Sequence, residues 1–193
     1  MKKLVVLALL SASVSAADRD QFYAGGNVFL VNNTKLGSAS IDENNDLGGG
    51  VFIGYNLPIH PSVDFGLELE YQRLGNAEDS DGPDSFKLKG DAFYINARPK
   101  FINEGNNLYS ALILGVGSVN SEATFHLSPY SDSGSDRWLS YQAGIEVGYM
   151  FDNLDFSVGY RYRKTNAKIQ IQNQSIKGDW VVQGITLGVR YNF

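Results

Sequence analysis

One histidine lies two residues before a serine in a polar stretch of the chain, at a spacing that could support hydrolysis. His126 and Ser128 are separated by a single residue. A serine nucleophile needs a histidine to accept its proton and a carboxylate to orient that histidine. The next predicted strand carries Glu146, but several residues along it and on its inner row. We therefore expect an ordinary polar loop at His126 and no enzyme activity.

An acidic segment offers a second candidate site, because carboxylates are the ligands that calcium prefers. The segment Asp79-Ser-Asp-Gly-Pro-Asp84 lacks the alternating ligands and the terminal bidentate glutamate of an EF-hand loop. We interpret it as a solvated loop, with weak divalent-cation binding as the alternative. The chain has 2 histidines and no cysteine, so we expect no transition-metal site and no cofactor.

Charged residues of both signs recur at alternate positions inside otherwise apolar segments. Between residues 63 and 74, Glu68 and Glu70 alternate with Leu67, Leu69 and Tyr71. A period of two predicts β-strands. The same pattern runs through residues 139–151, 154–162 and 184–193, and more weakly through 21–31, 47–57, 89–101 and 108–120. The stretch 111–116 is apolar at every position but one, so its orientation stays open.

The connections between these eight segments alternate in length. Short links occur at residues 58–62, 102–107 and 152–153, and long polar ones at 32–46, 75–88, 121–136 and 164–179. This rhythm predicts an all-β fold: an eight-stranded antiparallel up-and-down transmembrane β-barrel with short periplasmic turns and long extracellular loops. The alternation changes phase near Thr165 and Val181, which predicts either β-bulges or hairpin arms beyond the membrane.

Three features favour a membrane barrel over a soluble one, whose apolar rows would face its lumen. The apolar rows contain five to seven alternate residues, close to the span of about 9–11 residues of a tilted strand. The inward rows carry both signs of charge. Aromatic residues gather in two predicted belts. The belt near the short turns comprises Tyr55, Phe65, Phe101, Tyr149, Phe151, Phe156, Tyr191 and Phe193, and the outer belt Tyr71, Trp138, Tyr141, Tyr160, Tyr162 and Trp180.

The charges on the inward rows predict a salt-bridge network in the lumen. An eight-stranded barrel is only wide enough to be filled by side chains, and an unpaired buried charge costs several kcal/mol. We therefore predict a plug rather than a pore, with a narrow channel for small solutes as the alternative if a continuous water path remains. The predicted network comprises Glu68, Glu70, Arg98, Glu146, Arg161, Arg163 and Arg190, with Lys100 on the same row as Arg98.

The first 17 residues are typical of a signal peptide rather than of the fold. Lys2 and Lys3 precede the apolar run Leu4–Leu10, and small residues up to Ala17 allow cleavage after Ala16 or Ala17. The barrel domain is then residues 18–193. Removing two lysines and no acid changes the net charge from −5 to 14 − 21 = −7. A chain this acidic is a poor partner for nucleic acid.

The last eight residues, Thr186-Leu-Gly-Val-Arg-Tyr-Asn-Phe193, resemble the C-terminal assembly signal of outer-membrane proteins at Thr186, Gly188, Tyr191 and Phe193. With the strand layout, residues 18–193 resemble the small OmpA/OmpX-like, opacity-type outer-membrane β-barrels. The resemblance implies a multi-pass protein of the Gram-negative cell outer membrane. The implied partners are lipopolysaccharide, the assembly machinery and host or extracellular ligands. The implied function is surface interaction, adhesion or envelope integrity.

The His126-x-Ser128 pair is similar to that of lipid A deacylases, which are also eight-stranded barrels. The residues that flank His126 do not match the motif of that enzyme family. A lipid A-modifying enzyme is therefore a remote alternative.

Overall fold

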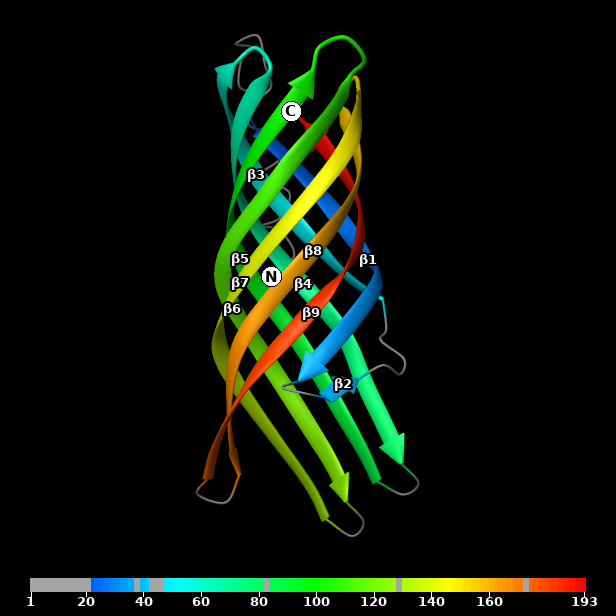
Figure 1. Cartoon of the computed structure of the whole chain (residues 1–193), viewed down its shortest axis with the longest axis vertical. Coiled ribbons are helices and arrows are strands. Elements are labelled where there is room, and N and C mark those ends of the chain that lie inside the picture. The colour runs from blue at the N-terminus through cyan, green and yellow to red at the C-terminus, as the bar shows by residue number, and fades with distance from the viewer. Residues whose placement is uncertain (1–21, 37–38, 42–46, 82–83, 128–129, 172–173) are drawn as a thin grey trace, which may run out of the picture.

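The computed structural model describes residues 22–36, 39–41, 47–81, 84–127, 130–171 and 174–193 (Figure 1). Every regular element within these ranges is a strand. The strands are β1 (Phe22–Leu36), β2 (Ala39–Ile41), β3 (Gly48–His60), β4 (Val63–Asp81), β5 (Asp84–Asn103), β6 (Leu108–Leu127), β7 (Tyr130–Phe151), β8 (Leu154–Ile171) and β9 (Gln174–Asn192). The predicted signal peptide, residues 1–17, lies outside the described residues.

Eight of these strands form a closed antiparallel barrel. Pairing runs in the order β1-β3-β4-β5-β6-β7-β8-β9, and β9 pairs back to β1. Among the described residues, the short strand β2 pairs only with the far end of β1, from Thr34–Ile41 to Leu36–Ala39, and takes no part in the closed wall. The backbone N–H of Phe193 donates to the carbonyl oxygen of Phe22 at 2.9 Å, which fastens the last strand to the first. The predicted eight-stranded barrel is confirmed.

Three short turns connect the strands at the end of the barrel that carries Phe22 and Phe193. The turns after β5 and β7 each contain one residue with positive φ, Asn107 at 55° and Asp152 at 50°. Asparagine and aspartate tolerate this left-handed conformation better than other residues with a Cβ. The backbone N–H of Met150 donates to Asn107 across neighbouring turns at 2.9 Å, so this end of the barrel is tightly tied.

The connections at the opposite end are long, as predicted, but most of their residues form strands rather than irregular loops. The β4–β5 ladder continues to Asp81–Asp84, β6–β7 to Leu127–Tyr130 and β8–β9 to Ile171–Gln174. These hairpins extend well past the barrel wall toward the bottom of Figure 1. Acidic and small polar residues interrupt the apolar alternation in these hairpins, although short runs such as Phe86-Lys-Leu88 and Ile169-Gln-Ile171 still alternate. The sequence therefore predicted polar links, with hairpin arms as one alternative near Thr165, where the backbone in fact pairs.

The phase changes near Thr165 and Val181 reflect hairpin arms rather than bulges. The register of β8 against β9 is continuous from Leu154–Tyr191 through Thr165–Trp180 to the hairpin tip. Register shifts occur instead in β1 at Phe29/Val31, in β3 at Pro58/His60 and in β4 at Arg73/Asn76. The bulge interpretation of β8 and β9 is wrong, because the register does not slip. The alternation is interrupted instead by polar residues on the outer face of β8, Lys164 and Asn166, and by apolar residues on the inner face of β9, Trp180 and Val182.

The two faces of the wall differ as the alternation predicts. On β4, Leu67 and Leu69 face outward and are half exposed, whereas Glu68 and Glu70 are 2% and 1% exposed. The ambiguous strand β6 turns Ile113 inward and Leu112 outward. Within the described ranges, no helix has the length and apolar character needed to cross a membrane.

Most of the predicted belt aromatics are exposed on the outer surface, but Trp180 is not. Tyr71, Tyr141, Tyr160 and Tyr162 are exposed near the hairpin end. Trp180 is 4% exposed and faces the lumen, so its assignment to the outer belt is wrong. The unbroken β8–β9 register is the reason, because it keeps every even-numbered position from Trp180 to Arg190 inside.

Candidate functional site: the barrel lumen

The lumen contains equal numbers of acidic and basic side chains. Five buried acids face five buried bases among the described residues, so the lumen is formally neutral when all ten are ionised. The acids are Asp64, Glu68, Glu70, Glu146 and Asp155, and the bases are Arg98, Lys100, Arg161, Arg163 and Arg190. All seven predicted network residues are in this set. Balanced charge is what a low-dielectric lumen requires, because isolated buried charges are costly.

At the short-turn end, a group that we call the inner cluster is organised around Arg190. Its members are Glu68, Arg98, Lys100, Glu146, Asp155 and Arg190. The guanidinium of Arg190 lies 3.9 Å from Glu68, 3.6 Å from Glu146 and 3.5 Å from Asp155. Arg98 donates to Glu146 through Nε at 3.0 Å and also through Nη2. Lys100 Nζ lies 2.9 Å from Asp155, so each acid has a basic partner.

Aromatic rings support the cations of the inner cluster. Lys100 Nζ lies 4.5 Å from the centre of the Tyr109 ring, and Arg98 lies 5.5 Å from it. Arg190 lies 4.9 Å from the Tyr23 ring centre and 5.1 Å from that of Phe52. Cations over ring faces gain about 1–2 kcal/mol when desolvated. Tyr23 and Tyr109 thus fill space while they stabilise the charges.

A second group, the waist cluster, surrounds Glu70 at mid-height. It consists of Asn27, Glu70, Gln72, Asn96, Gln142 and Arg161. Arg161 Nη1 donates to both oxygens of Glu70, at 2.8 and 2.7 Å. Asn27, Asn96 and Gln142 each donate an amide hydrogen to the same carboxylate, at 2.8, 2.8 and 3.0 Å. This number of donors offsets the loss of hydration of a buried carboxylate.

Arg163 differs from the other lumen cations, although the sequence predicted it in the salt-bridge network. Its Nε donates to Gln72 Oε1 at 2.6 Å, and its guanidinium lies 4.0 Å from the centre of the Phe29 ring. No carboxylate of the described residues lies within ion-pair distance of it, and its Nη1 and Nη2 have no hydrogen-bond partner among them. Arg163 is thus held by an amide and a ring.

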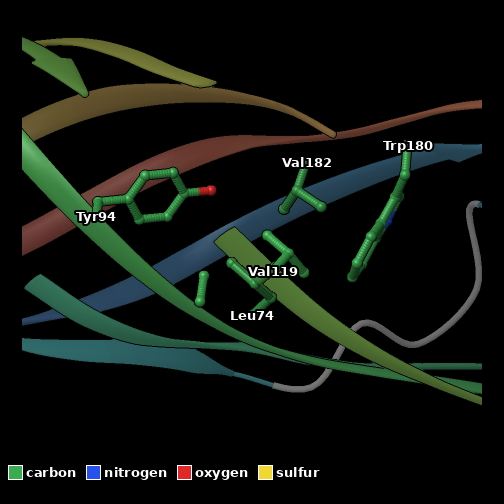
Figure 2. Packing of buried hydrophobic residues seen from close by; sticks show 6 residues of the cluster. Leu74, Tyr94, Val119, Trp180 and Val182 are labelled. Carbon is green, nitrogen blue, oxygen red and sulfur yellow. The ribbon is translucent and has the colours of Figure 1, made fainter. Parts of the chain in front are cut away.

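Beyond Arg163, toward the hairpin arms, the lumen becomes apolar. Figure 2 shows the side chains that we call the outer cap, contributed by β4, β5, β6 and β9. They are Leu74, Ala92, Tyr94, Val119, Trp180 and Val182. The hydroxyl of Tyr94 lies 2.8 Å from Ser140 Oγ, to which Thr165 also donates at 2.9 Å. This set of hydroxyl contacts separates the cap from the charged clusters.

Fully buried polar side chains fill the described lumen on the β4 and β5 side. A water column would touch the inward side chains and leave part of their area accessible. Gln72, Asn96 and Arg98 are 0% exposed. The sequence analysis left Asp64 and Asp155 out of the predicted network, and also the amide side chains of the waist cluster. Both aspartates alternate with apolar residues on the predicted inward rows, and this alternation could have identified them.

The other sequence candidates are only partly described. Ser128 and residues 82–83 of the acidic segment lie outside the described residues. The backbone of His126 pairs with Ser85 and Ser131 within the β5–β6–β7 hairpin arms. The ordinary polar loop at His126 and the solvated acidic segment therefore stay predictions, with serine catalysis and weak divalent-cation binding as their alternatives. Among the described residues, no group of three or more histidines and acids is arranged to hold a metal ion.

The comparison with protein families agrees with this architecture. Residues 4–193 match the family described as outer membrane protein β-barrel domain. The chain belongs to this family. It is accordingly a bacterial outer-membrane protein whose strands cross the membrane repeatedly. No curated protein matches the sequence.

Several solved outer-membrane barrels share the fold of this family member. The attachment invasion locus protein Ail of Yersinia pestis is 15% identical, with a TM-score of 0.53, covering 91% of this chain and 100% of Ail. A major outer membrane protein from Thermus thermophilus is 12% identical, with a TM-score of 0.56, covering 89% and 99%. The outer membrane protease OmpT from Escherichia coli is 12% identical, with a TM-score of 0.51, covering 94% and 99%. At these identities the likeness concerns the fold, which hosts both proteases and other proteins.

Proposed function

We propose that this chain is a non-enzymatic, non-conducting barrel that presents its extracellular hairpin arms for surface interaction, adhesion or envelope integrity. The sealed lumen carries the proposal. Gln72 and Asn96 in the waist cluster and Arg98 in the inner cluster are 0% exposed, which supports a lumen that is filled by side chains. The parts of the chain accessible from outside the cell are then the hairpin arms and the first long link predicted from the sequence, residues 32–46. A narrow channel would need these side chains to part.

The arms are suited to presentation because their backbones pair almost to the tip. We define the hairpin arms as residues 76–89, 121–136 and 166–179. The first and second are joined to each other from Ser85–His126 to Lys89–Glu122, which makes a four-stranded extension of the wall. A paired sheet loses less conformational entropy on binding than a disordered loop. The barrel thus holds the paired hairpin arms in place as a binding surface.

The charges of the arms favour a positively charged partner for the first two. Residues 76–89 contain four acids and two lysines, and residues 121–136 contain three acids and no lysine or arginine. The third arm is different, with Lys168 and Lys177 against Asp179. One structure of Ail, 16% identical to this chain, contains the heparin analogue sucrose octasulfate. Acidic arms would repel such a polyanion, so we expect any sulfated ligand to contact only the third arm.

Shortening the arms tests this function without touching the lumen. In three variants, residues 76–89, 121–136 or 166–179 are each replaced by Asn-Gly, which forms tight hairpin turns. We expect loss of binding to host cells or matrix, or loss of resistance to bile salts or serum, in at least one variant. A full-length control replaces Asp79, Asp81 and Asp84 by Asn and separates charge from length.

Folding of each shortened variant is checked by the gel shift between unboiled and boiled samples that folded outer-membrane barrels show. Folded, inserted variants with wild-type adhesion and envelope resistance would contradict the proposed function.

We also infer that the C-terminal strand carries the assembly signal. Tyr191 and Phe193 face outward with ring centres 5.2 Å apart, while Thr186 faces the lumen. Replacing Phe193 by Ala should lower the amount of assembled barrel in the outer membrane. Phe151→Ala is the matched control, because Phe151 is an exposed aromatic at the same end of the barrel but outside the terminal strand. Equal assembly of both variants would count against the signal.

A further inference from the structure

The hairpin arms have two faces of opposite character, and the backbone register assigns each residue to one of them. On β5, Ala92 is buried in the lumen, and the pairing of β5 with β6 runs without a shift from there into the arms. Successive residues of a strand lie on opposite faces. Phe86 and Leu88 therefore lie on the face that continues the lumen side of the wall. Lys87 and Lys89 lie on the outer face.

The same assignment extends across the four strands of the first two arms. Phe86 pairs with Phe125 of β6 and with Asp79 of β4. Phe125 pairs in turn with Asp132 of β7. Directly paired residues share a face of a sheet, so these four positions form one row on the lumen side. The register shift of β4 at Arg73/Asn76 is what moves its odd-numbered residues, Asp79 among them, to this face.

The lumen-side face of the first two arms, which we call the arm face, has an apolar centre and acidic borders. Its centre lies on β5 and β6 and consists of Phe86, Leu88, Ala123, Phe125 and Leu127. Its borders lie on β4, at the tip of β5 and on β7, and consist of Asp79, Asp81, Asp84, Asp132 and Asp136. Among the described residues of these arms, the arm face contains no lysine or arginine. An apolar strip is thus bordered by negative charge alone.

The outer face of the same two arms is polar at every described position. Its charges balance, with Glu78 and Glu122 against Lys87 and Lys89, and the other positions are Asn, Ser, Thr or His. This is the reverse of the membrane wall, where Phe93 is 59% exposed on the outer surface. Lipid accounts for the apolar rows of the wall. An apolar row beyond the membrane indicates a different kind of partner.

Neither the third arm nor a second arm face complements this surface. The β8–β9 register places Ile169, Ile171 and Ile176 on the lumen side of the third arm. It places Lys168 and Lys177 on the outer side, so the third arm offers apolar surface without a cation. The arm face of a second copy carries the same negative charges and would repel the first. A complementary partner must present apolar and basic groups together.

The width of the arm face matches a helix. β4 and β7 are three strand spacings of about 4.8 Å apart, which is about 14 Å. An α-helix with its side chains is about 10–12 Å wide. The third arm leaves this sheet where β7–β8 pairing ends, at Ser140–Thr165, and its tip lies apart from the other two at the lower left of Figure 1.

We propose that the arm face binds a cationic amphipathic helix of a partner. The apolar stripe of the helix lies on Phe86 and Phe125, and its flanking lysines or arginines reach Asp79 on one side and Asp132 on the other. The inference rests on the proposed function, in which the arms bind a surface partner, and adds which face binds and what chemistry it recognises.

Binding of a synthetic helix to the full-length barrel tests the proposal. The probe is a leucine–lysine peptide of about 18 residues, or five helical turns, with leucine along one stripe and lysine elsewhere. The barrel is held in phosphatidylcholine nanodiscs, and binding to empty nanodiscs is subtracted. We expect saturable binding that weakens with added salt. A peptide with glutamate in place of every lysine should not bind, and equal binding of the two peptides would overturn the proposal.

Two double variants with the same loss of charge test which face binds. Asp79→Asn with Asp132→Asn removes two charges from the arm face and should weaken binding roughly three- to tenfold. Glu78→Gln with Glu122→Gln removes two charges from the outer face and should change binding less than about twofold. Equal weakening by the two double variants would overturn the proposal.

The apolar centre is tested by Phe125→Ser, with His126→Ser as the control on the outer face of the same strand. Phe125→Ser should weaken binding roughly tenfold or more, because a central aromatic anchor is lost, and His126→Ser should leave it unchanged. Equal binding by Phe125→Ser and wild type would overturn the proposal. Folding is verified by the gel shift, and if Phe125→Ser does not fold, the charge variants decide.

The variant that lacks residues 121–136 separates this inference from the proposed function. We expect it to lose peptide binding. Undiminished peptide binding by this variant would overturn the inference, whatever happens to adhesion. Lost peptide binding with wild-type adhesion and envelope resistance in every shortened variant would contradict the proposed function alone.

Discussion

The two ends of the lumen are filled by opposite chemistry. The inner cluster packs six charged side chains against the rings of Tyr23, Phe52 and Tyr109, whereas the outer cap packs Leu74, Trp180, Val182 and their neighbours with few polar atoms. Each charge of the inner cluster depends on its partners, because removing one leaves another buried and uncompensated. Each apolar residue of the cap contributes mainly its own volume. The two ends should therefore respond differently to substitution.

The largest effect is expected at the centre of the inner cluster. Replacing Arg190 by Leu leaves Glu68, Glu146 and Asp155 short of positive charge and should lower the free energy of unfolding by about 3–5 kcal/mol. Urea titration of folding into lipid vesicles measures this loss. Arg190→Lys, which keeps the charge but loses the fork of donors, should lose less. A loss below about 1 kcal/mol for Arg190→Leu would break the contrast between the two ends.

A somewhat smaller loss is expected in the outer cap. Trp180→Ala empties the volume next to Gly90 and Leu74 and should cost about 3 kcal/mol in the same titration. Trp180→Phe refills part of that volume and should recover much of the stability. Equal losses for the alanine and phenylalanine variants would show that Trp180 does not act by packing.

Arg163 lies at the boundary between the two ends and should behave like neither. It has no carboxylate partner among the described residues, so Arg163→Met removes a buried charge without stranding an acid. Loss of its hydrogen bond to Gln72 partly offsets that gain. We expect a change within about 1 kcal/mol of wild type. A loss as large as that of Arg190→Leu would mean that Arg163 belongs to the charged network after all.

The smallest effect is expected outside the lumen, at the ion pair of Lys164 and Asp179. Lys164 Nζ and Asp179 Oδ2 lie 2.7 Å apart, but about half of each side chain is exposed. Water and salt screen such a pair, so Lys164→Ala should leave the urea midpoint unchanged within error. A clear shift in the urea midpoint that disappears at high salt would show that this exposed ion pair contributes measurably to stability.

The barrel could be predicted from the sequence because each membrane strand carries its own signal. Lipid requires apolar residues at every second position, and Leu67, Leu69 and Tyr71 satisfy it without reference to any other strand. The positions of Glu68, Glu70 and Arg161 on the inward rows follow from the same alternation. The hairpin arms carry only a broken signal, because acidic and small polar residues interrupt the alternation there.

The pairing inside the lumen could not be predicted, because it depends on the register between strands distant in sequence. Glu70 and Arg161 are 91 residues apart and meet across the barrel. The difference between Arg161, which binds Glu70, and Arg163, which binds Gln72, is likewise invisible in a strand where both simply face inward. Trp180 was misplaced for a related reason, since an aromatic residue near a strand end suits either a lipid belt or a lumen cap.

Single-channel recording tests the central claim, a sealed lumen, most directly. The full-length barrel is folded into lipid vesicles, its folding is verified by the gel shift on boiling, and it is then fused to a planar bilayer. The account predicts a silent membrane over the full voltage range that the bilayer tolerates. Discrete conductance steps that change in size when Arg161 is replaced by Ala would contradict it, because they would show that ions pass the waist cluster.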